Sequence, residues 1–261
     1  MEKIYTITAE KVVAGFSEWD CLDPSKRNVW KQDDTIIKFD TRQLLIEEKL
    51  NAALLQATGK RTVKSTILPL QQEDFARLRL DYQAAWPGAD NILVMPEVVG
   101  SRFDQAMAKA TQDDKKRLLK DFSDLIVPYM LTGFSDQHQK NIIVEESSGE
   151  LVTLDTYPAL FEEGQFFGNA QSMEIVYETT PFNGFIKLNM YCPDKDRLIQ
   201  QCDEAEQHLQ EHFPVEEVDV LLTELKAVAP KFRENLKDLK GSDVRETMLA
   251  RTRELRDYLR K

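Results

Sequence analysis

The sequence has no excess of basic residues, few cysteines and no long apolar run, and each of these absences excludes a class of protein. The formal net charge is −11 over 261 residues. A chain this acidic does not attach broadly to nucleic acid or anionic lipid, although a local basic cleft can still bind phosphate. We therefore expect no nucleic-acid partner, and we expect small molecules or proteins to be bound instead.

The three cysteines, Cys21, Cys192 and Cys202, show no metal-ligand spacing and cannot all pair with one another. Free thiols favour a reducing compartment. The first residues, MEKIYTITAEKVV, contain no apolar stretch of the kind that signal peptides need, and the longest uncharged apolar run, residues 125–131, is far too short for a membrane span. We expect a soluble protein of the cytoplasm or another reducing compartment. The interior of a host cell, reached by specialised secretion, is one such compartment.

Short apolar runs rich in β-branched residues dominate the chain up to about Gly100 and predict strands. They include IYTIT, VVAGF, NVW, TIIKF, RTVKSTIL and NILVM. One helix is predicted among them over residues 43–57, because its apolar residues recur with helical spacing and Gly59 lies just beyond its end. Its apolar stripe consists of Ile46, Leu50, Ala53, Leu54 and Ala57. Residues 73–85 predict a second helical stretch.

Helical periodicity takes over after Gly100. The stretch KKRLLKDFSDLIVPYML carries an apolar stripe that predicts a long helix, whose last turn Pro128 is expected to bend or loosen. Two short strands, NIIVEE and LVTLD, follow and are joined by SSGE, which suits a hairpin. From about Asp194 onward the charged sequence predicts three or four amphipathic helices. The fold class is therefore α+β, with a β-rich lobe over residues 1–98 and a mostly helical lobe over residues 99–261.

Three oxygen-bearing side chains accompany the predicted hairpin. Asn141 opens its first strand and Asp155 ends its second, so the two side chains come to neighbouring strand ends and can bind one Mg²⁺ ion. Asp136, five residues before Asn141, can then face a nucleophile. Phosphoryl transfer needs little more at its centre than a cation on the phosphate oxygens and a carboxylate that orients or deprotonates the attacking hydroxyl.

The spacing D-x-H-x-x-N, followed by a β-branched run and by an Asp fourteen residues after the Asn, resembles the catalytic and metal-binding loops of the protein-kinase-like superfamily. The resemblance is to its atypical branches, which include aminoglycoside phosphotransferases, phosphoinositide kinases, HipA-type kinases and small bacterial effector kinases. It implies a bilobal kinase-like fold that uses ATP and Mg²⁺, with Asp136 as catalytic base and Asn141 and Asp155 as metal ligands. His138 either supports the loop as a structural imidazole or contacts a phosphate.

Other residues stand where this superfamily places its nucleotide-binding groups. Lys38, in the run DTIIKFD, resembles the lysine that binds the α- and β-phosphates of ATP. Glu47 on the next helix resembles the carboxylate that orients this lysine, with Glu48 as an open alternative. The run NILVMPEVVG resembles the fifth strand and the hinge, which implies that Met95 is the gatekeeper and that the backbone up to Val98 meets the adenine.

The sequence departs from the superfamily at several positions. No G-x-G-x-x-G precedes Lys38, so a phosphate cover would have to come from EWDCLDPSKRN. Phe134 replaces the His of His-Arg-Asp, Thr156 and Tyr157 replace Phe-Gly, and no Ala-Pro-Glu follows Asp155. The missing activation segment leaves the phosphoryl acceptor open, as a protein or a small hydroxyl-bearing molecule.

The leading hypothesis is a compact atypical bacterial protein kinase, secreted effectors included. One alternative is a small-molecule kinase with an acidic acceptor pocket. The C-terminal helices offer acids for such a pocket, among them Asp203, Glu204 and Glu206. Further alternatives are a pseudokinase that only binds, a helical adaptor, and the AMP transfer or glutamylation that the same fold supports. His208 and His212 lie four residues apart without an acidic motif, so we expect a solvated helix face rather than a metal site.

Overall fold

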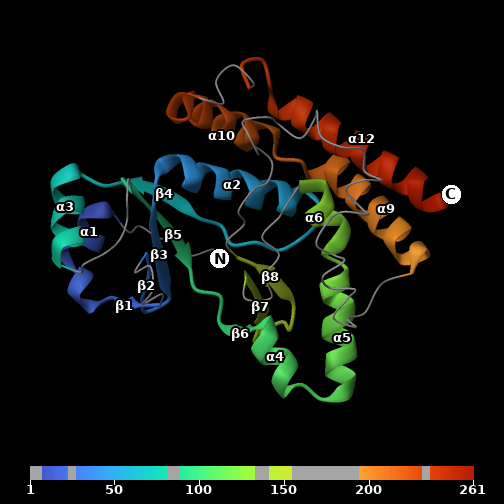
Figure 1. The fold of residues 1–261 in the computed structure, drawn as a ribbon, viewed down its shortest axis with the longest axis horizontal. Helices are drawn as coiled ribbons and strands as arrows, with labels where there is room; N and C mark the ends of the chain where they lie inside the picture. The colour runs from blue at the N-terminus through green and yellow to red at the C-terminus, as the bar shows by residue number, and fades with distance from the viewer. Residues whose placement is uncertain (1–7, 23–27, 82–88, 133–140, 155–193, 231–235) are drawn as a thin grey trace. The chain divides into compact units, whose positions relative to one another are not determined.

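The computed structural model describes residues 8–22, 28–81, 89–132, 141–154, 194–230 and 236–261 (Figure 1). The architecture is mixed α/β, and the strands in these ranges form two antiparallel sheets. The chain forms two compact units. Unit 1 comprises Met1–Ile46 and Lys64–Glu97, and unit 2 comprises Glu47–Val63 and Val98–Lys261. The arrangement of lobes expected from the sequence stays a prediction.

Unit 1 is built on a five-stranded antiparallel sheet. The strand order is β1-β2-β3-β5-β4, so β5 lies between two strands that precede it in the sequence. The strands are β1 (Asp20–Cys21), β2 (Val29–Gln32), β3 (Thr35–Asp40), β4 (Thr66–Pro69) and β5 (Asn91–Pro96). The runs TIIKF and NILVM therefore form strands as predicted. Helix α3 (Gln72–Asp81) confirms the described part of the second helical stretch.

The strand predicted for VVAGF is wrong. The segment forms helix α1 (Ala9–Ala14) and a 3-10 turn, Phe16–Glu18. The side chain of Thr8 accepts a hydrogen bond from the backbone N–H of Lys11, which is an N-cap that β-branched content does not reveal. Val12 and Phe16 are both buried, so the short helix supplies core residues in place of a strand.

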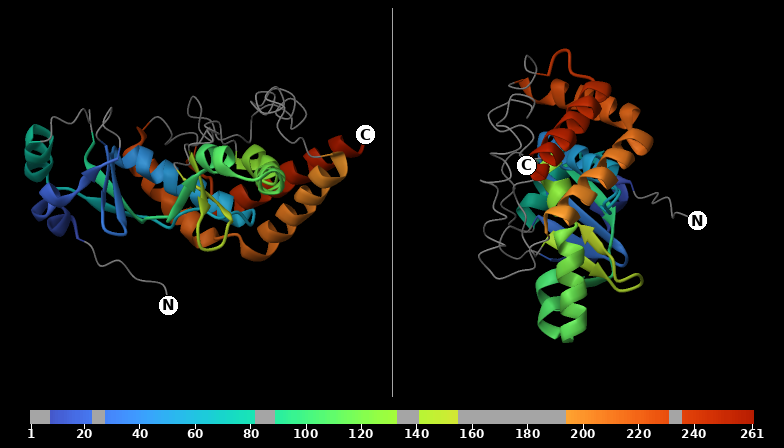
Figure 2. Two further views of the ribbon diagram at one scale, coloured as in Figure 1. Left: turned by 90° about the horizontal axis from the view of Figure 1, so that it is seen from below. Right: turned by 90° about the vertical axis from the view of Figure 1, so that its right-hand side faces the viewer.

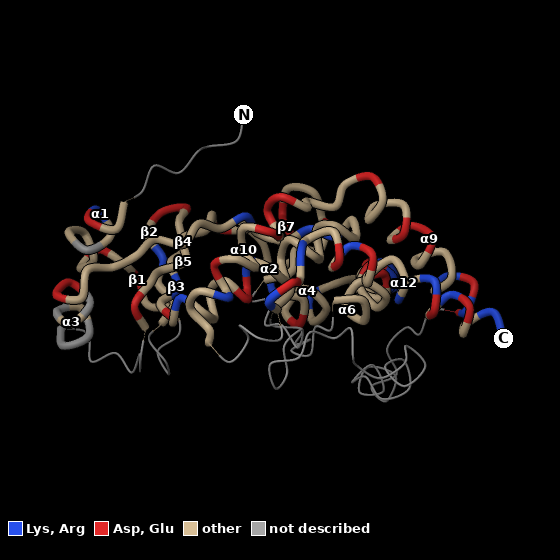
Figure 3. The backbone as a smooth tube through the Cα atoms, turned by 90° about the horizontal axis from the view of Figure 1, so that it is seen from above, with Lys and Arg blue, Asp and Glu red and all other residues tan. Residues whose placement is uncertain are grey.

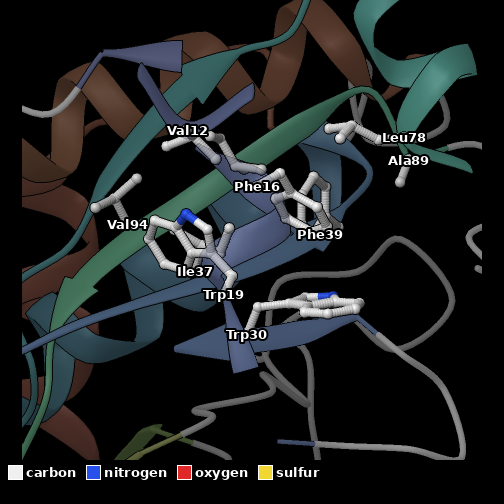
Figure 4. Close-up of a cluster of buried hydrophobic side chains, with 10 residues drawn as sticks. Val12, Phe16, Trp19, Trp30, Ile37, Phe39, Leu78, Ala89 and Val94 are labelled. Atoms are coloured by element: carbon white, nitrogen blue, oxygen red, sulfur yellow. The ribbon is translucent and has the colours of Figure 1, made fainter. Parts of the chain in front are cut away.

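An aromatic cluster forms the core of unit 1 (Figure 4). The ring of Phe16 lies 4.8 Å from that of Trp30 and 5.5 Å from that of Phe39, in tilted and edge-on arrangements that aromatic pairs prefer. Ile37 and Phe39 of β3 both belong to this cluster. Because side chains alternate along a strand, Lys38 between them lies on the opposite face of the sheet.

Helix α2 (Arg42–Ala57) confirms the predicted helix and its apolar stripe, all of which is buried. The helix ends as its sequence indicates. Gly59 adopts a φ of 82°, and its N–H donates to the carbonyl oxygen of Gln56 while the N–H of Lys60 donates to that of Leu55. A left-handed residue at this position commonly ends a helix, and glycine adopts it without a Cβ penalty.

Replacing Gly59 with alanine is expected to destabilise the fold by about 1–3 kcal/mol, because the left-handed backbone strains an L side chain. A Cβ at this position would also lie 2.7 Å from the imidazole of His208. Thermal unfolding of Gly59→Ala measures the sum of both effects. The double variant with His208→Ala removes the clash and leaves the backbone strain. An unchanged melting temperature in the single variant would contradict the assignment.

Unit 2 contains a three-stranded antiparallel sheet and a layer of long helices. The sheet order is β6 (Gly100–Arg102), β7 (Ile142–Glu145) and β8 (Leu151–Thr153). Strands β7 and β8 confirm the predicted hairpin, and Gly149 in its turn has a φ of 73°. Helices α9 (Lys195–His212) and α10 (Val215–Val228) both pack on α12 (Gly241–Arg260), as Figure 2 also shows. The apolar stripes predicted for these helices are buried.

The long helix predicted around Pro128 is interrupted at a different place. Helix α5 (Gln112–Ser123) ends before Asp124, and α6 (Ile126–Thr132) begins two residues later. Pro128 therefore lies in the first turn of α6, where a missing N–H disrupts no helical hydrogen bond. Gln201 of α9 joins the two helix ends, since its side chain accepts from the N–H of Val127 at 3.4 Å and donates to the carbonyl oxygen of Ser123 at 3.2 Å.

Candidate functional site

Lys38 lies at the centre of the unit 1 sheet, on the face opposite the aromatic cluster. Its strand neighbours are Val29 on β2 and Leu93 on β5, and Lys38 is only 6% exposed. Directly paired residues of antiparallel strands share a face, and Ile36 pairs with Met95. The structure therefore brings Lys38 and Met95 to one sheet face. Burying an ammonium group is costly unless an anionic group accompanies it, so this position suits a carboxylate or phosphate partner.

Glu47 and Glu48 are both buried on α2, at 7% exposure each. Neither is a surface carboxylate, and burial does not distinguish between them. Asn51, one helical turn later, is fully buried, and within the described part of the chain neither its side-chain oxygen nor its nitrogen has a hydrogen-bond partner. The middle of α2 thus carries three buried polar side chains. The sequence did not predict a role for Asn51, because an asparagine between apolar residues does not by itself indicate whether its side chain is buried.

Met95 and Val98 lie near the point where the chain leaves unit 1. Met95 is half-buried near the end of β5, and the N–H of Glu97 donates to the carbonyl oxygen of Asp34 at 2.8 Å. Val98 is half-buried and begins the second segment of unit 2. The next residue, Val99, accepts at its carbonyl oxygen from the N–H of Glu146 at 2.9 Å. Both ends of this short connector are therefore held by backbone hydrogen bonds within their own units.

Asn141 immediately precedes β7 and is half-buried. Its carbonyl oxygen accepts a hydrogen bond from the N–H of Leu154 at 2.7 Å, so Asn141 lies beside the residue that precedes Asp155. Asp155 itself, Asp136 and His138 lie outside the described residues. Their convergence with Asn141 stays a prediction.

A buried hydrogen bond connects helix α6 to the hairpin. The hydroxyl of Tyr129 lies 2.9 Å from Oγ1 of Thr153 on β8. Burial raises the pKa of Tyr129 well above its usual range, so this phenol stays neutral and serves a structural role. Thr132 ends α6, directly before residues 133–140, and Asn141 follows them. The two described elements that flank these residues are therefore joined inside unit 2.

The acidic residues proposed for an acceptor pocket are paired with arginines of α9 and α12. Arg256 of α12 contacts Asp203 at 2.8 Å and Glu206 at 2.6 Å, and Arg197 contacts Glu204 at 3.1 Å. Figure 3 shows acidic and basic positions side by side along α9 and α12. Asp203 and Glu206 therefore help to hold α9 against α12, whereas the pair of Glu204 and Arg197 lies within α9.

The histidines and cysteines of the described residues form no cluster with other candidate groups. His208 and His212 are exposed on α9, as predicted. No group of three or more His, Cys, Asp or Glu side chains that could hold a metal ion occurs within the described ranges. Burial raises the pKa of the Cys202 thiol to about 12, and Cys21 is also a free thiol. Among the described helices, none has the length and apolar character needed to cross a membrane.

No protein-family model matches the chain, and no curated protein matches it either. Among solved structures the chain is similar to the proinflammatory kinase CtkA of Helicobacter pylori, with 11% identity, a TM-score of 0.42 and coverage of 87% of this chain and 94% of that one. It is also similar to HipA of Shewanella oneidensis, solved with HipB and its operator DNA, with 15% identity, a TM-score of 0.37 and coverage of 96% and 73%. Because these values are low, a functional assignment has to rest on the chain's own residues.

Proposed function

We propose that the chain is an ATP- and Mg²⁺-dependent phosphotransferase of kinase-like fold, acting as a compact atypical bacterial protein kinase. The observation that carries the proposal is the hydrogen bond between Leu154 and Asn141 at one end of the hairpin. It supports the expected convergence of Asn141 and Asp155, whose hard oxygen atoms are the ligands that Mg²⁺ prefers. When bound, Mg²⁺ neutralises charge on the phosphate oxygens.

Each candidate residue has a separate role in the proposed reaction. Lys38 binds the α- and β-phosphates, and Glu47, or its neighbour Glu48, orients this lysine. Met95 and the backbone up to Val98 contact the adenine. These assignments follow the resemblance of the sequence, and the buried position of Lys38 on the sheet face that it shares with Met95 supports them.

In the chemical step the acceptor hydroxyl oxygen forms a bond to the γ-phosphorus, and the bond from this phosphorus to the β,γ-bridging oxygen breaks, which releases ADP. Asp136 accepts the proton of the hydroxyl. A protein acceptor is favoured over a small cationic molecule because Asp203, Glu204 and Glu206 are already paired with arginines.

The function is tested with ATP carrying a label on either the γ- or the α-phosphate, incubated with the protein and Mg²⁺ in cell extract. Transfer of the γ-label alone to a protein band is the expected result. Transfer of the α-label would indicate AMP transfer instead. Thermal unfolding is the companion measurement, because ATP and Mg²⁺ at about 100 times the dissociation constant should stabilise the fold by roughly 2.7 kcal/mol. The absence of any stabilisation, with or without metal, would overturn nucleotide use.

A further inference from the structure

The segment that follows α2 runs beside the hairpin and forms one isolated β-bridge with it. Thr62 forms a parallel bridge with Thr153 of β8, and the N–H of Thr153 donates to the carbonyl oxygen of Arg61 at 3.0 Å. Thr62 is also tied back to the helix, because its hydroxyl accepts from the side-chain amide of Gln56 at 2.7 Å. The end of α2 and the edge of β8 are therefore joined within unit 2.

The side chain of Arg61 binds the opposite end of the same hairpin. Its Nη1 donates to Oε2 of Glu145 and to Oε2 of Glu150, both at 2.7 Å, and its Nη2 donates to Oε1 of Glu145 at 3.1 Å. Ser148 in the turn adds contacts, accepting from Nη1 at 3.3 Å and donating to Glu145 at 2.6 Å. Glu145 ends β7 and Glu150 precedes β8, so one guanidinium group connects both strands.

This arrangement is stronger than an ordinary surface ion pair. Bidentate binding of a carboxylate by a guanidinium fixes both the orientation of the two groups and the distance between them. Isolated exposed ion pairs lack this geometry. The hydrogen bonds from Arg61 and Ser148 lower the pKa of Glu145 to about 2, so the carboxylate is ionised at any physiological pH. Arg61 thus binds the hairpin twice, with its carbonyl oxygen at Thr153 and with its side chain at the turn.

We propose that Arg61 is a positioning residue that holds the hairpin against the end of α2 and thereby sets the place of Asn141. The inference rests on the proposed function, in which Asn141 binds Mg²⁺. The bond between Leu154 and Asn141 lies next to Thr153, so loosening β8 at Arg61 displaces the strand end that fixes Asn141. Groups that orient metal ligands without touching the metal typically change metal affinity by about 10- to 100-fold.

The test compares Arg61→Ala with Arg117→Ala. Arg117 of α5 donates to the carbonyl oxygen of Gly149 at 3.3 Å, so it contacts the same hairpin turn from α5. Arg61→Ala is expected to raise the Mg²⁺ concentration for half-maximal ATP binding about tenfold while leaving metal-free nucleotide binding unchanged. Arg61→Lys should recover only part of the loss, because an ammonium group lacks the two-pronged geometry. Arg117→Ala should behave like the wild type.

Amide hydrogen exchange gives a readout that needs no ligand. The amides of Thr153 and Leu154 should exchange about tenfold faster in Arg61→Ala than in the wild type, and at the wild-type rate in Arg117→Ala. Unchanged exchange in Arg61→Ala would overturn the inference, as would equal effects of the two variants. If the wild type bound no nucleotide, the proposed function would fail, and the exchange rates would still decide whether Arg61 holds the hairpin. Glu145→Gln keeps the shape of the side chain and removes its charge. The amides of Thr153 and Leu154 should exchange faster in this variant than in the wild type, but by less than in Arg61→Ala.

Discussion

Lys38→Met is expected to lower ATP turnover at least about a hundredfold, comparable to the loss of one preorganised charge-stabilising group in other enzymes. The physical reason is the position of Lys38, which is 6% exposed in the middle of a sheet face. At such a site water cannot replace the ammonium group as a partner for phosphate oxygens. Turnover is measured by release of ADP at saturating ATP and Mg²⁺.

Two further variants separate phosphate binding from stability. Lys38→Arg keeps a positive charge at this buried position, but a planar guanidinium does not reproduce the geometry of the ammonium group. Lys116→Met is the control for loss of a positive charge, because Lys116 is an exposed lysine of α5. We expect Lys38→Arg to fold and to be nearly inactive, and Lys116→Met to remain active. Wild-type turnover in Lys38→Met would refute the role of this lysine.

Periodicity predicted most of the secondary structure because burial decides it. The stripe of α2, the hairpin of β7 and β8 and the three C-terminal helices all bury the residues whose spacing indicated them. The two errors have a common cause. In VVAGF the capping side chain of Thr8 outweighs β propensity, and Pro128 is harmless because α6 begins just before it. Apolar spacing carries no information about where a helix begins.

The candidate site was predictable only where neighbouring residues form it. The hairpin pairs residues close in sequence, so the proximity of Asn141 to the residue before Asp155 could be predicted. The shared face of Lys38 and Met95 depends on β5 pairing with β3, and spacing alone does not determine strand order. Arg61 and Gln201 contact partners remote in the sequence. A single polar residue gives no signal of such partners, so their roles emerged only from the structure.

Asp155→Ala and Asp136→Ala are expected to differ in their effects on ATP binding and on turnover. Asp155→Ala removes a proposed Mg²⁺ ligand, so metal-dependent ATP binding and turnover should both be lost. Asp136→Ala removes the proposed base and should leave ATP binding near the wild-type level while lowering turnover by about 10²–10⁴-fold. Thermal unfolding with ATP, in the presence and absence of Mg²⁺, measures binding. ADP release measures turnover.

Asn141→Ala and Asp113→Ala complete the comparison. Asn141→Ala should weaken Mg²⁺-dependent ATP binding, as Asp155→Ala does, because the two side chains are assigned to one ion. Asp113 is an exposed acid in the first turn of α5, and its replacement controls for the general loss of negative charge. Wild-type turnover in Asp155→Ala, or equal loss of nucleotide binding in Asp155→Ala and Asp136→Ala, is incompatible with separate roles for a metal ligand and a base. A distinct outcome for each aspartate would tie both to phosphoryl transfer, because a module that only binds nucleotide needs no base.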